Sequence, residues 1–264
     1  LPGVRRRVLT SATAAVDIPA FTGITAPVRL SFLKDVKESK GLALRVVKSP
    51  VKDKLETLYK LLGELKGGSA LIFCNYRETV ERVSNYLTEM GVDNEYFHGG
   101  MEQPERERAL SHFRNGSATV FISTDLASRG LDIPEVKNVI HYHLPVSEEA
   151  YVHRNGRTAR MNAEETIPEY ITREPDEFFL PEVAKKPVRS EWVTLMINRG
   201  KRDKLSKKDV VGFLFQKGGL EKDDLGIVEI KESCAFAAVK RTKLSGLLGR
   251  IRNEKIKNMK AKFI

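Results

Sequence analysis

Residues 153–160, with the sequence HRNGRTAR, place three arginines and a histidine around one glycine. A guanidinium group is planar and always charged, and it can donate two parallel hydrogen bonds to phosphate oxygens. In phosphoryl transfer such a group neutralises the charge that develops on the γ-phosphate. The segment therefore reads either as a solvated surface turn or as a site that faces phosphate, and the neighbouring motifs decide between the two.

Four further short motifs occur in order along the chain: residues 11–13 (SAT), 71–75 (LIFCN), 98–106 (HGGMEQPER) and 123–132 (STDLASRGLD). In the third, Gln103 and Arg106 lie one turn apart on a predicted helix that follows Gly99 and Gly100. Exposed glycine amides and an arginine at the start of a helix form a natural seat for phosphate. Taken alone, Arg106 is also compatible with a surface salt bridge, and Asp132 with a plain turn.

The segments that must position these motifs alternate in pattern between residues 52 and 144. Residues 70–74, 96–97, 119–123 and 139–142 are predicted strands, and residues 54–65, 79–90 and 104–113 are predicted helices. Strands that are apolar on both faces and separated by helices indicate βαβ units and a parallel sheet. Ligands of such sheets bind at the carboxyl ends of the strands, which is where the motifs fall.

The last part of the chain has a different pattern. Four prolines between residues 168 and 187 indicate a linker. Residues 192–197, 225–230, 235–239 and 260–264 are then predicted strands, and residues 207–215 and 244–251 predicted helices. This βαββαβ order is the split-βαβ arrangement of RNA-recognition modules. The predicted fold is therefore an α/β domain with a parallel sheet, followed by a smaller α+β domain.

Positive charge is concentrated in that smaller domain. Residues 191–264 hold 18 Lys and Arg against 9 Asp and Glu, whereas the first 190 residues hold 27 against 26. A basic module joined to a near-neutral one indicates a polyanion contact, although basic faces also serve solubility. Among the positions that stack bases in RNA-recognition modules, only Phe236 is aromatic, and it fits the core as well as a stacking platform. Loops and helix faces are therefore the expected RNA contacts.

Composition also excludes several classes of protein. No apolar run approaches the ~20 residues that a membrane-spanning helix needs, and the N-terminal residues do not resemble a signal peptide. Cys74 and Cys234 are far apart and lack a CxxC or clustered histidines, so neither a disulfide nor a metal site is expected. The chain is predicted to be cytoplasmic.

Together, the five motifs resemble the second half of a DEAD-box RNA helicase, as its motifs III, IV, the glycine motif with the Q-x-x-R helix, V and VI. The basic domain resembles the C-terminal RNA-binding domain of DbpA-type helicases. The resemblance implies the end of a first RecA-like domain and a hinge at residues 1–30 and a second RecA-like domain at 31–165. It also implies a linker at 166–190 and an RRM-like domain at 191–264.

The resemblance also implies roles for single residues. Arg157 and Arg160 match arginine fingers for ATP, while His153 and Arg154 match positions that contact the first domain and couple nucleotide to RNA. Asp132 matches the carboxylate that binds the ribose, and Arg129 and Gly130 belong to the same nucleotide-facing motif. The implied RNA contacts are Asn75, Arg77, Gly99, Gly100, Gln103, Arg106 and Thr124 in the larger domain and Lys201, Arg202, Lys204, Lys240 and Arg241 in the smaller one.

The sequence departs from the family at a few places. Tyr76 stands where the family often has Thr, and Ala159 where it usually has Gly. After Arg160 no apolar strand follows, as it normally does in the family, so the sheet is expected to expose an edge unless a short segment is missing there.

The phosphate loop G-x-x-x-x-G-K-[ST] and the Asp-Glu-Ala-Asp motif do not occur in this sequence. In the family they belong to the first domain, which also holds Mg²⁺, so this chain alone is expected not to hydrolyse ATP. The function that the resemblance implies is local, ATP-dependent unwinding of structured RNA, with a ribosomal RNA hairpin of the large subunit as the partner. The alternative is a stand-alone RNA-binding or regulatory protein with a vestigial helicase half, and a DNA helicase is disfavoured by the RNA-module-like domain.

Overall fold

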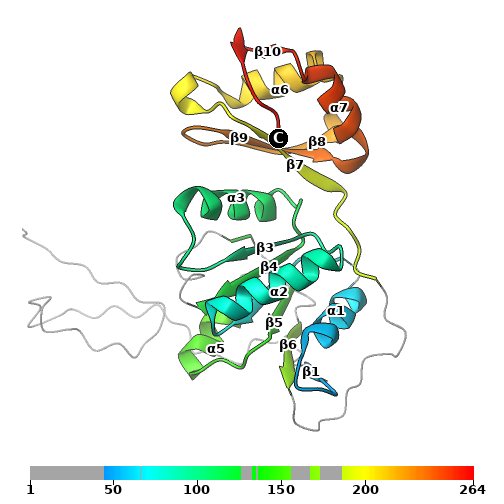
Figure 1. Ribbon diagram of the computed structural model, residues 1–264, viewed down its shortest axis with the longest axis vertical. Coiled ribbons are helices and arrows are strands. Elements are labelled where there is room, and N and C mark those ends of the chain that lie inside the picture. Colours follow the sequence, from blue (N-terminus) through cyan, green and yellow to red (C-terminus); the bar gives the residue numbers. More distant parts are fainter. Residues whose placement is uncertain (1–44, 66, 126–132, 135, 156–166, 173–185) are drawn as a thin grey trace, which may run out of the picture. The chain divides into compact units, whose positions relative to one another are not determined.

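The computed structural model describes residues 45–65, 67–125, 133–134, 136–155, 167–172 and 186–264 (Figure 1). The predicted end of a first RecA-like domain at residues 1–30, with its motif at residues 11–13, lies outside these residues. The predicted linker is described only in part.

The larger domain is built on a six-stranded sheet with the order β1-β6-β5-β2-β4-β3, in which every pairing is parallel. Its strands are β1 (Arg45–Lys48), β2 (Ala70–Cys74), β3 (Asn94–Phe97), β4 (Val120–Thr124), β5 (Asn138–His141) and β6 (Ile167–Thr172). Its helices are α1 (Leu55–Glu64), α2 (Arg77–Glu89), α3 (Gln103–Arg114) and α5 (Glu148–Asn155). The prediction of a parallel α/β sheet is confirmed.

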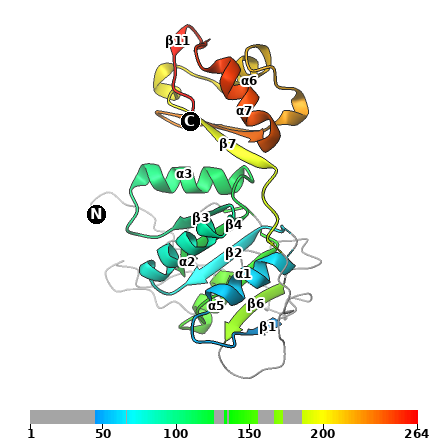
Figure 2. The same cartoon turned by 45° about the vertical axis from the view of Figure 1, so that its right-hand side comes forward.

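The central strand β2 is buried on both faces, as its unbroken apolar sequence requires. Ile72 and Cys74 point to one face and pack in a core with the leucines of α1 and the valines of α2. Leu71 and Phe73 point to the other face and pack in a second core with Ala109 and residues of α3 and β4. Figure 2 shows the strands and these helices from a second side. The sheet is thus a rigid support for the loops at its carboxyl edge.

The strand β6 corrects a prediction. Residues 166–190 are predicted to be a linker, and the sheet to lack a strand after Arg160, but Ile167–Thr172 pair in parallel with both β1 and β5. The misreading comes from Pro168, since a proline cannot donate to the ladder and normally marks an edge strand or a break. The two neighbouring strands supply pairing on both sides, which the local sequence does not reveal.

The smaller domain has an antiparallel three-stranded sheet with the order β7-β9-β8 and its own apolar core. Its elements are β7 (Trp192–Ile197), α6 (Lys207–Gln216), β8 (Leu225–Ile230), β9 (Ala235–Lys240), α7 (Leu244–Ile251), β10 (Lys255–Ile256) and β11 (Met259–Lys260). The predicted strand at residues 260–264 is only partly formed. A short β10–β11 hairpin comes first, and Phe263 then makes an isolated antiparallel bridge to Ile197.

The two cysteines lie in different domains. Cys74 is buried, and burial raises the pKa of its thiol to about 12, so the thiol stays protonated and packs as a small apolar side chain. Cys234 is half-buried just before β9. Among the described residues, no helix has the length and apolar character needed to cross a membrane.

Candidate functional site

The carboxyl ends of the parallel strands share one edge of the larger sheet. Asn75 follows β2, Gly99 and Gly100 follow β3, and Thr124 is the last residue of β4. Neighbouring strands are in register, so these residues lie side by side along that edge. Three motifs that are far apart in the sequence therefore meet at one place, as predicted for a ligand site of this class of sheet.

The buried side chain of Arg154 connects the residues at this edge by hydrogen bonds. Its side chain is 1% exposed, and its Nε and Nη2 donate to the two carboxylate oxygens of Asp125 at 2.5 and 2.7 Å. Nη2 also donates to Asn75 Oδ1 at 2.8 Å. Nη1 lies 2.6 Å from the carbonyl oxygen of His143 and 3.2 Å from His141 Nδ1. All five N–H groups of the guanidinium therefore have partners within this domain.

This geometry gives Arg154 a second task besides the predicted one. It ties α5 to the ends of β2, β4 and β5. A direct contact with another domain, as predicted for Arg154, requires that one of these hydrogen bonds be exchanged. His153 lies beside it on α5 and is half-buried. The predicted roles of both residues in catalysis remain predictions.

Asn75 is held at both ends of its side chain. Besides the bond to Arg154, its Nδ2 donates to Leu144 O at 3.2 Å, and its backbone N–H donates to His143 Nδ1 at 3.1 Å. Burial, and then the positive charges of Lys54 and Arg154, lower the pKa of His143 to about 4. The ring is therefore neutral at ordinary pH and can accept this hydrogen bond. Asn75 is thus held at the end of β2 through its backbone N–H, its side-chain oxygen and its side-chain nitrogen.

The predicted phosphate seat consists of Gly99 and Gly100 with Gln103 and Arg106 of the following helix, and the structure adds Arg77 of α2, so that Gly99, Gly100, Arg77 and Arg106 lie together. Arg106 Nη2 donates to Gly99 O at 2.8 Å. A Cβ built on Gly99 would lie 3.3 Å from Arg77 Nη2, and one on Gly100 3.5 Å from Arg77 Nη1. Two guanidinium groups from α2 and α3 thus flank an exposed turn whose lack of side chains lets them approach. Paired guanidinium groups beside such a turn suit the oxygens of a phosphodiester.

The start of α3 explains why the helix begins at this place. Pro104 stands in the first turn, where its missing N–H costs nothing, and the Glu105 carboxylate accepts the backbone N–H of Glu102 at 3.1 Å. Gln103 is exposed at the first position of the helix, with Nε2 3.2 Å from Glu107 Oε1. Gln103 lies within the same helical turn as Arg106, as predicted.

The remaining predicted residues of the larger domain are placed less fully. Thr124 is half-buried at the end of β4, directly before the Asp125 that binds Arg154. The five residues that were predicted to bind the nucleotide lie outside the described residues: Arg129, Gly130, Asp132, Arg157 and Arg160.

In the smaller domain, basic residues from two segments of the chain form one surface, which we call the basic corner. It consists of Lys201, Arg202, Lys204 and Lys257, all exposed. Lys204 and Lys257 have positive φ angles of 57° and 50°, and Lys257 Nζ donates to Lys204 O at 2.8 Å. Residues other than glycine seldom adopt positive φ angles, so the surrounding fold must stabilise the backbone at both lysines. Lys240 lies apart from this corner, half-buried at the end of β9.

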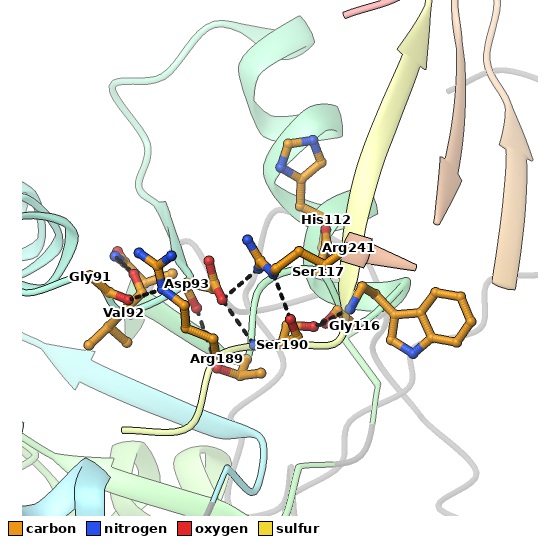
Figure 3. A network of polar contacts seen from close by, with 12 residues as sticks. Gly91, Val92, Asp93, His112, Gly116, Ser117, Arg189, Ser190 and Arg241 are labelled. Carbon is orange, nitrogen blue, oxygen red and sulfur yellow. Dashed lines mark hydrogen bonds and ion pairs between the residues drawn. The ribbon is translucent and has the colours of Figure 1, made fainter. Parts of the chain in front are cut away.

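Arg241, a predicted RNA contact, has contacts within the protein that the sequence did not predict. Its Nη2 forms an ion pair with Asp93 Oδ2 of the larger domain at 2.8 Å, and its Nε donates to Ser190 O at 2.8 Å. Ser190 N–H donates to the same Asp93 oxygen at 2.9 Å. Figure 3 shows this network. The prediction of Arg241 as an RNA contact overlooked this partner, since the ion pair and hydrogen bonds engage the guanidinium between the domains.

The sheet of the smaller domain also meets the larger one, through α3. Phe236 and Ala238 alternate with the core residues of β9, yet they are only 3% and 0% exposed. The Phe236 ring makes an edge contact with His112, with ring centroids 6.1 Å apart. Thr194 Oγ1 accepts a hydrogen bond from Asn115 Nδ2 at 2.8 Å. The face on which RNA-recognition modules stack bases is therefore covered here by a helix.

Asp93, Ser190 and His98 were missed by sequence reasoning. Asp93 and Ser190 bind each other across 97 positions and bind Arg241 across 148 and 51 positions, so no local pattern marks them. His98 directly precedes the two glycines of the phosphate seat, and its position is a signal that was available.

Two protein families match parts of the chain. Residues 53–162 match the family described as helicase conserved C-terminal domain, and residues 194–263 match the DbpA RNA binding domain. The two matched segments contain the phosphate seat and the basic corner, respectively.

The chain is also similar to individual proteins and to solved structures. The chain is 27% identical to the ATP-dependent RNA helicase DbpA of Bacillus subtilis, over 99% of the chain and 63% of that protein. It is 29% identical to the protein of the same name from Escherichia coli, over 91% and 56%. Among solved structures, it resembles the DEAD-box protein SrmB of E. coli bound to regulator of ribonuclease activity A, with 32% identity, a TM-score of 0.46, and coverage of 50% of this chain and 78% of that one. The chain thus spans less than two thirds of the length of the two helicases.

Proposed function

Since the chain belongs to the DEAD-box RNA helicases and carries the DbpA RNA-binding domain, we propose that it is the C-terminal part of an enzyme that uses ATP to unwind structured RNA locally. The observation that carries the proposal is the phosphate seat of Gly99, Gly100, Arg77 and Arg106. The seat offers two guanidinium groups to a nucleic-acid backbone, of which Arg106 is held by the carbonyl oxygen of Gly99, and it lies at the carboxyl edge of the larger sheet.

In this proposal the nucleotide is shared between two RecA-like domains. Arg157 and Arg160 neutralise charge on the phosphates, and Asp132 binds the ribose, with Arg129 and Gly130 in the same motif. The other RecA-like domain supplies the phosphate loop, the Asp-Glu-Ala-Asp motif and the Mg²⁺ ligands. The Arg154 network supports this view, because it fixes the end of α5 immediately before the two arginines.

We propose that the RNA partner is a hairpin of large-subunit ribosomal RNA, bound first by the smaller domain, and that the enzyme acts in the cytoplasm during ribosome assembly. The covered sheet face and the exposed basic corner support binding through loops and helix ends rather than by base stacking. Charge alone does not select a sequence, so selectivity must come from the shape of the folded RNA.

The test of the proposal is the Arg106→Ala variant of the full-length protein. It should reduce the rate of duplex unwinding about tenfold or more, because it removes a charge-assisted contact to phosphate. Total RNA affinity should change far less, because the smaller domain holds the RNA independently. Unwinding of a fluorescent duplex and binding by anisotropy measure the two effects.

The matched control is Arg108→Ala, since Arg108 lies on the same helix and is about half exposed, with Glu95 3.8 Å away and no contact to the seat. Arg108→Ala should unwind like the wild type. Equal losses in unwinding for the two variants, or equal losses of unwinding and binding for Arg106→Ala, would contradict the proposed seat.

A second prediction concerns the basic corner. For the 264-residue chain, the logarithm of affinity for a folded RNA should fall with the logarithm of salt concentration at a slope of about −3 to −4, as four or five phosphate contacts require. Changing Lys201 and Arg202 together to Glu should weaken binding and reduce the steepness of that slope by roughly 1.5. Titrations at several salt concentrations measure both quantities.

Two variants serve as controls for the basic corner. Lys222→Glu changes an exposed lysine of the same domain outside the corner and should have a much smaller effect. Phe236→Leu keeps an apolar side chain against α3 and should leave RNA affinity nearly unchanged. A folded Phe236→Leu variant that no longer binds RNA would restore the sheet as the binding surface.

A further inference from the structure

His98 is a buried polar side chain directly beneath the phosphate seat. It is 5% exposed, and its ring stacks on Tyr96 with the centroids 5.6 Å apart. Its Nδ1 accepts the backbone N–H of Gly100 at 3.1 Å, and its Nε2 lies 2.9 Å from Glu81 Oε1. Nδ1 is therefore hydrogen-bonded to the turn, whereas Nε2 lies beside the Glu81 carboxylate of α2 without the geometry of a hydrogen bond.

These contacts specify the form of the imidazole ring. A nitrogen that accepts a hydrogen bond carries no proton, so in this arrangement the ring proton is on Nε2, toward the carboxylate of Glu81. A carboxylate beside one ring nitrogen fixes the tautomer and the orientation of the ring. Glu81 thus prepares Nδ1 to receive the Gly100 amide.

The contact of His98 with Gly100 sets the geometry of the seat. The carbonyl oxygen of His98 accepts the N–H of Met101 at 3.2 Å, which closes the turn over the two glycines. Arg106 binds Gly99 O in the same turn. His98 therefore fixes the loop through Gly100 and Met101, while Arg106 fixes it through the carbonyl oxygen of Gly99.

We propose that His98, oriented by Glu81, is a positioning residue for RNA binding: it presets the Gly99–Gly100 turn so that a phosphodiester enters a seat already formed. The inference rests on the proposed function, because it assumes that this seat binds RNA. A loop fixed in advance binds with less loss of conformational entropy, so the effect is expected in the KM for RNA of the ATPase, which reports occupation of the seat, rather than in kcat or in total RNA binding.

The experiment measures RNA-dependent ATPase of the full-length protein as a function of RNA concentration. His98→Ala should raise the KM for RNA about tenfold, the effect of one lost buried hydrogen bond, with little change in kcat. His98→Asn keeps an oxygen that can accept the Gly100 N–H and should recover most of that loss. Glu81→Ala should raise the KM by less than His98→Ala, and Glu81→Gln by less still.

The set of variants separates the possible outcomes. Arg106→Ala with an unchanged KM for RNA means that the seat itself, and so the proposed function, is wrong. If Arg106→Ala raises the KM but His98→Ala and Glu81→Ala do not, only the positioning role is overturned. Equal losses in His98→Ala and His98→Asn would also overturn it, since the ring would then act by packing alone. Should His98→Ala fail to fold, the comparison of His98→Asn and the two Glu81 variants still decides the matter.

Discussion

Replacing Arg157 or Arg160 by alanine in the full-length protein should lower RNA-stimulated ATPase activity by about 10³-fold or more. The expected loss is large because a guanidinium stabilises charge that exists only in the transition state, and water replaces it poorly. Steady-state phosphate release at saturating RNA and ATP measures the effect. RNA affinity should stay near that of the wild type, since the basic corner is untouched.

Two controls make this prediction specific. Arg108→Ala removes an arginine of the same domain away from the phosphate-facing motifs and should keep ATPase activity within about twofold of the wild type. The 264-residue chain by itself should hydrolyse no ATP. An ATPase rate within a few-fold of the wild type in both finger variants, or activity of the isolated chain that disappears with Arg157, would refute the assignment.

The Arg154→Ala variant should lose about 3–5 kcal/mol of stability in the larger domain, because removing one member of a buried ion pair leaves the other without compensation. Besides the ion pair, Arg154→Ala removes further hydrogen bonds. Asp125, the side-chain oxygen of Asn75 and the carbonyl of His143 all lose a donor at once. Urea denaturation monitored by far-UV circular dichroism, with hydrogen exchange of β2 and β4, measures the change in the free energy of unfolding.

Arg154→Lys is the informative control. A lysine keeps the charge but has three donors in a different geometry, so it should recover only a small part of the loss. Arg157→Ala should unfold like the wild type in the same assay, which separates the buried Arg154 from the proposed arginine finger three positions away. An Arg154→Ala variant within about 1 kcal/mol of the wild type would contradict the central role of Arg154 at the edge.

Local sequence was sufficient to predict the parallel sheet. The run Ala70–Cys74 is apolar throughout, which suits a strand covered on both faces, and the segment that becomes α3 shows its start through Pro104 and Glu105. The meeting of Gly99, Gly100 and Arg106 also followed from sequence, because these residues are neighbours along the chain and a helix turn spaces the last of them. Interactions between residues that are close along the chain can therefore be predicted from the sequence.

The tertiary structure alone decided the roles of Arg154, Arg241 and the strand Ile167–Thr172. Both arginines resemble their basic neighbours in sequence, but one is buried among the ends of three strands and the other pairs with Asp93, 148 positions away. The strand reads as a linker until β1 and β5 pair with it on both sides. Such partners come from distant parts of the chain, and burial turns a charge that would be solvated on a surface into a contact that the fold depends on.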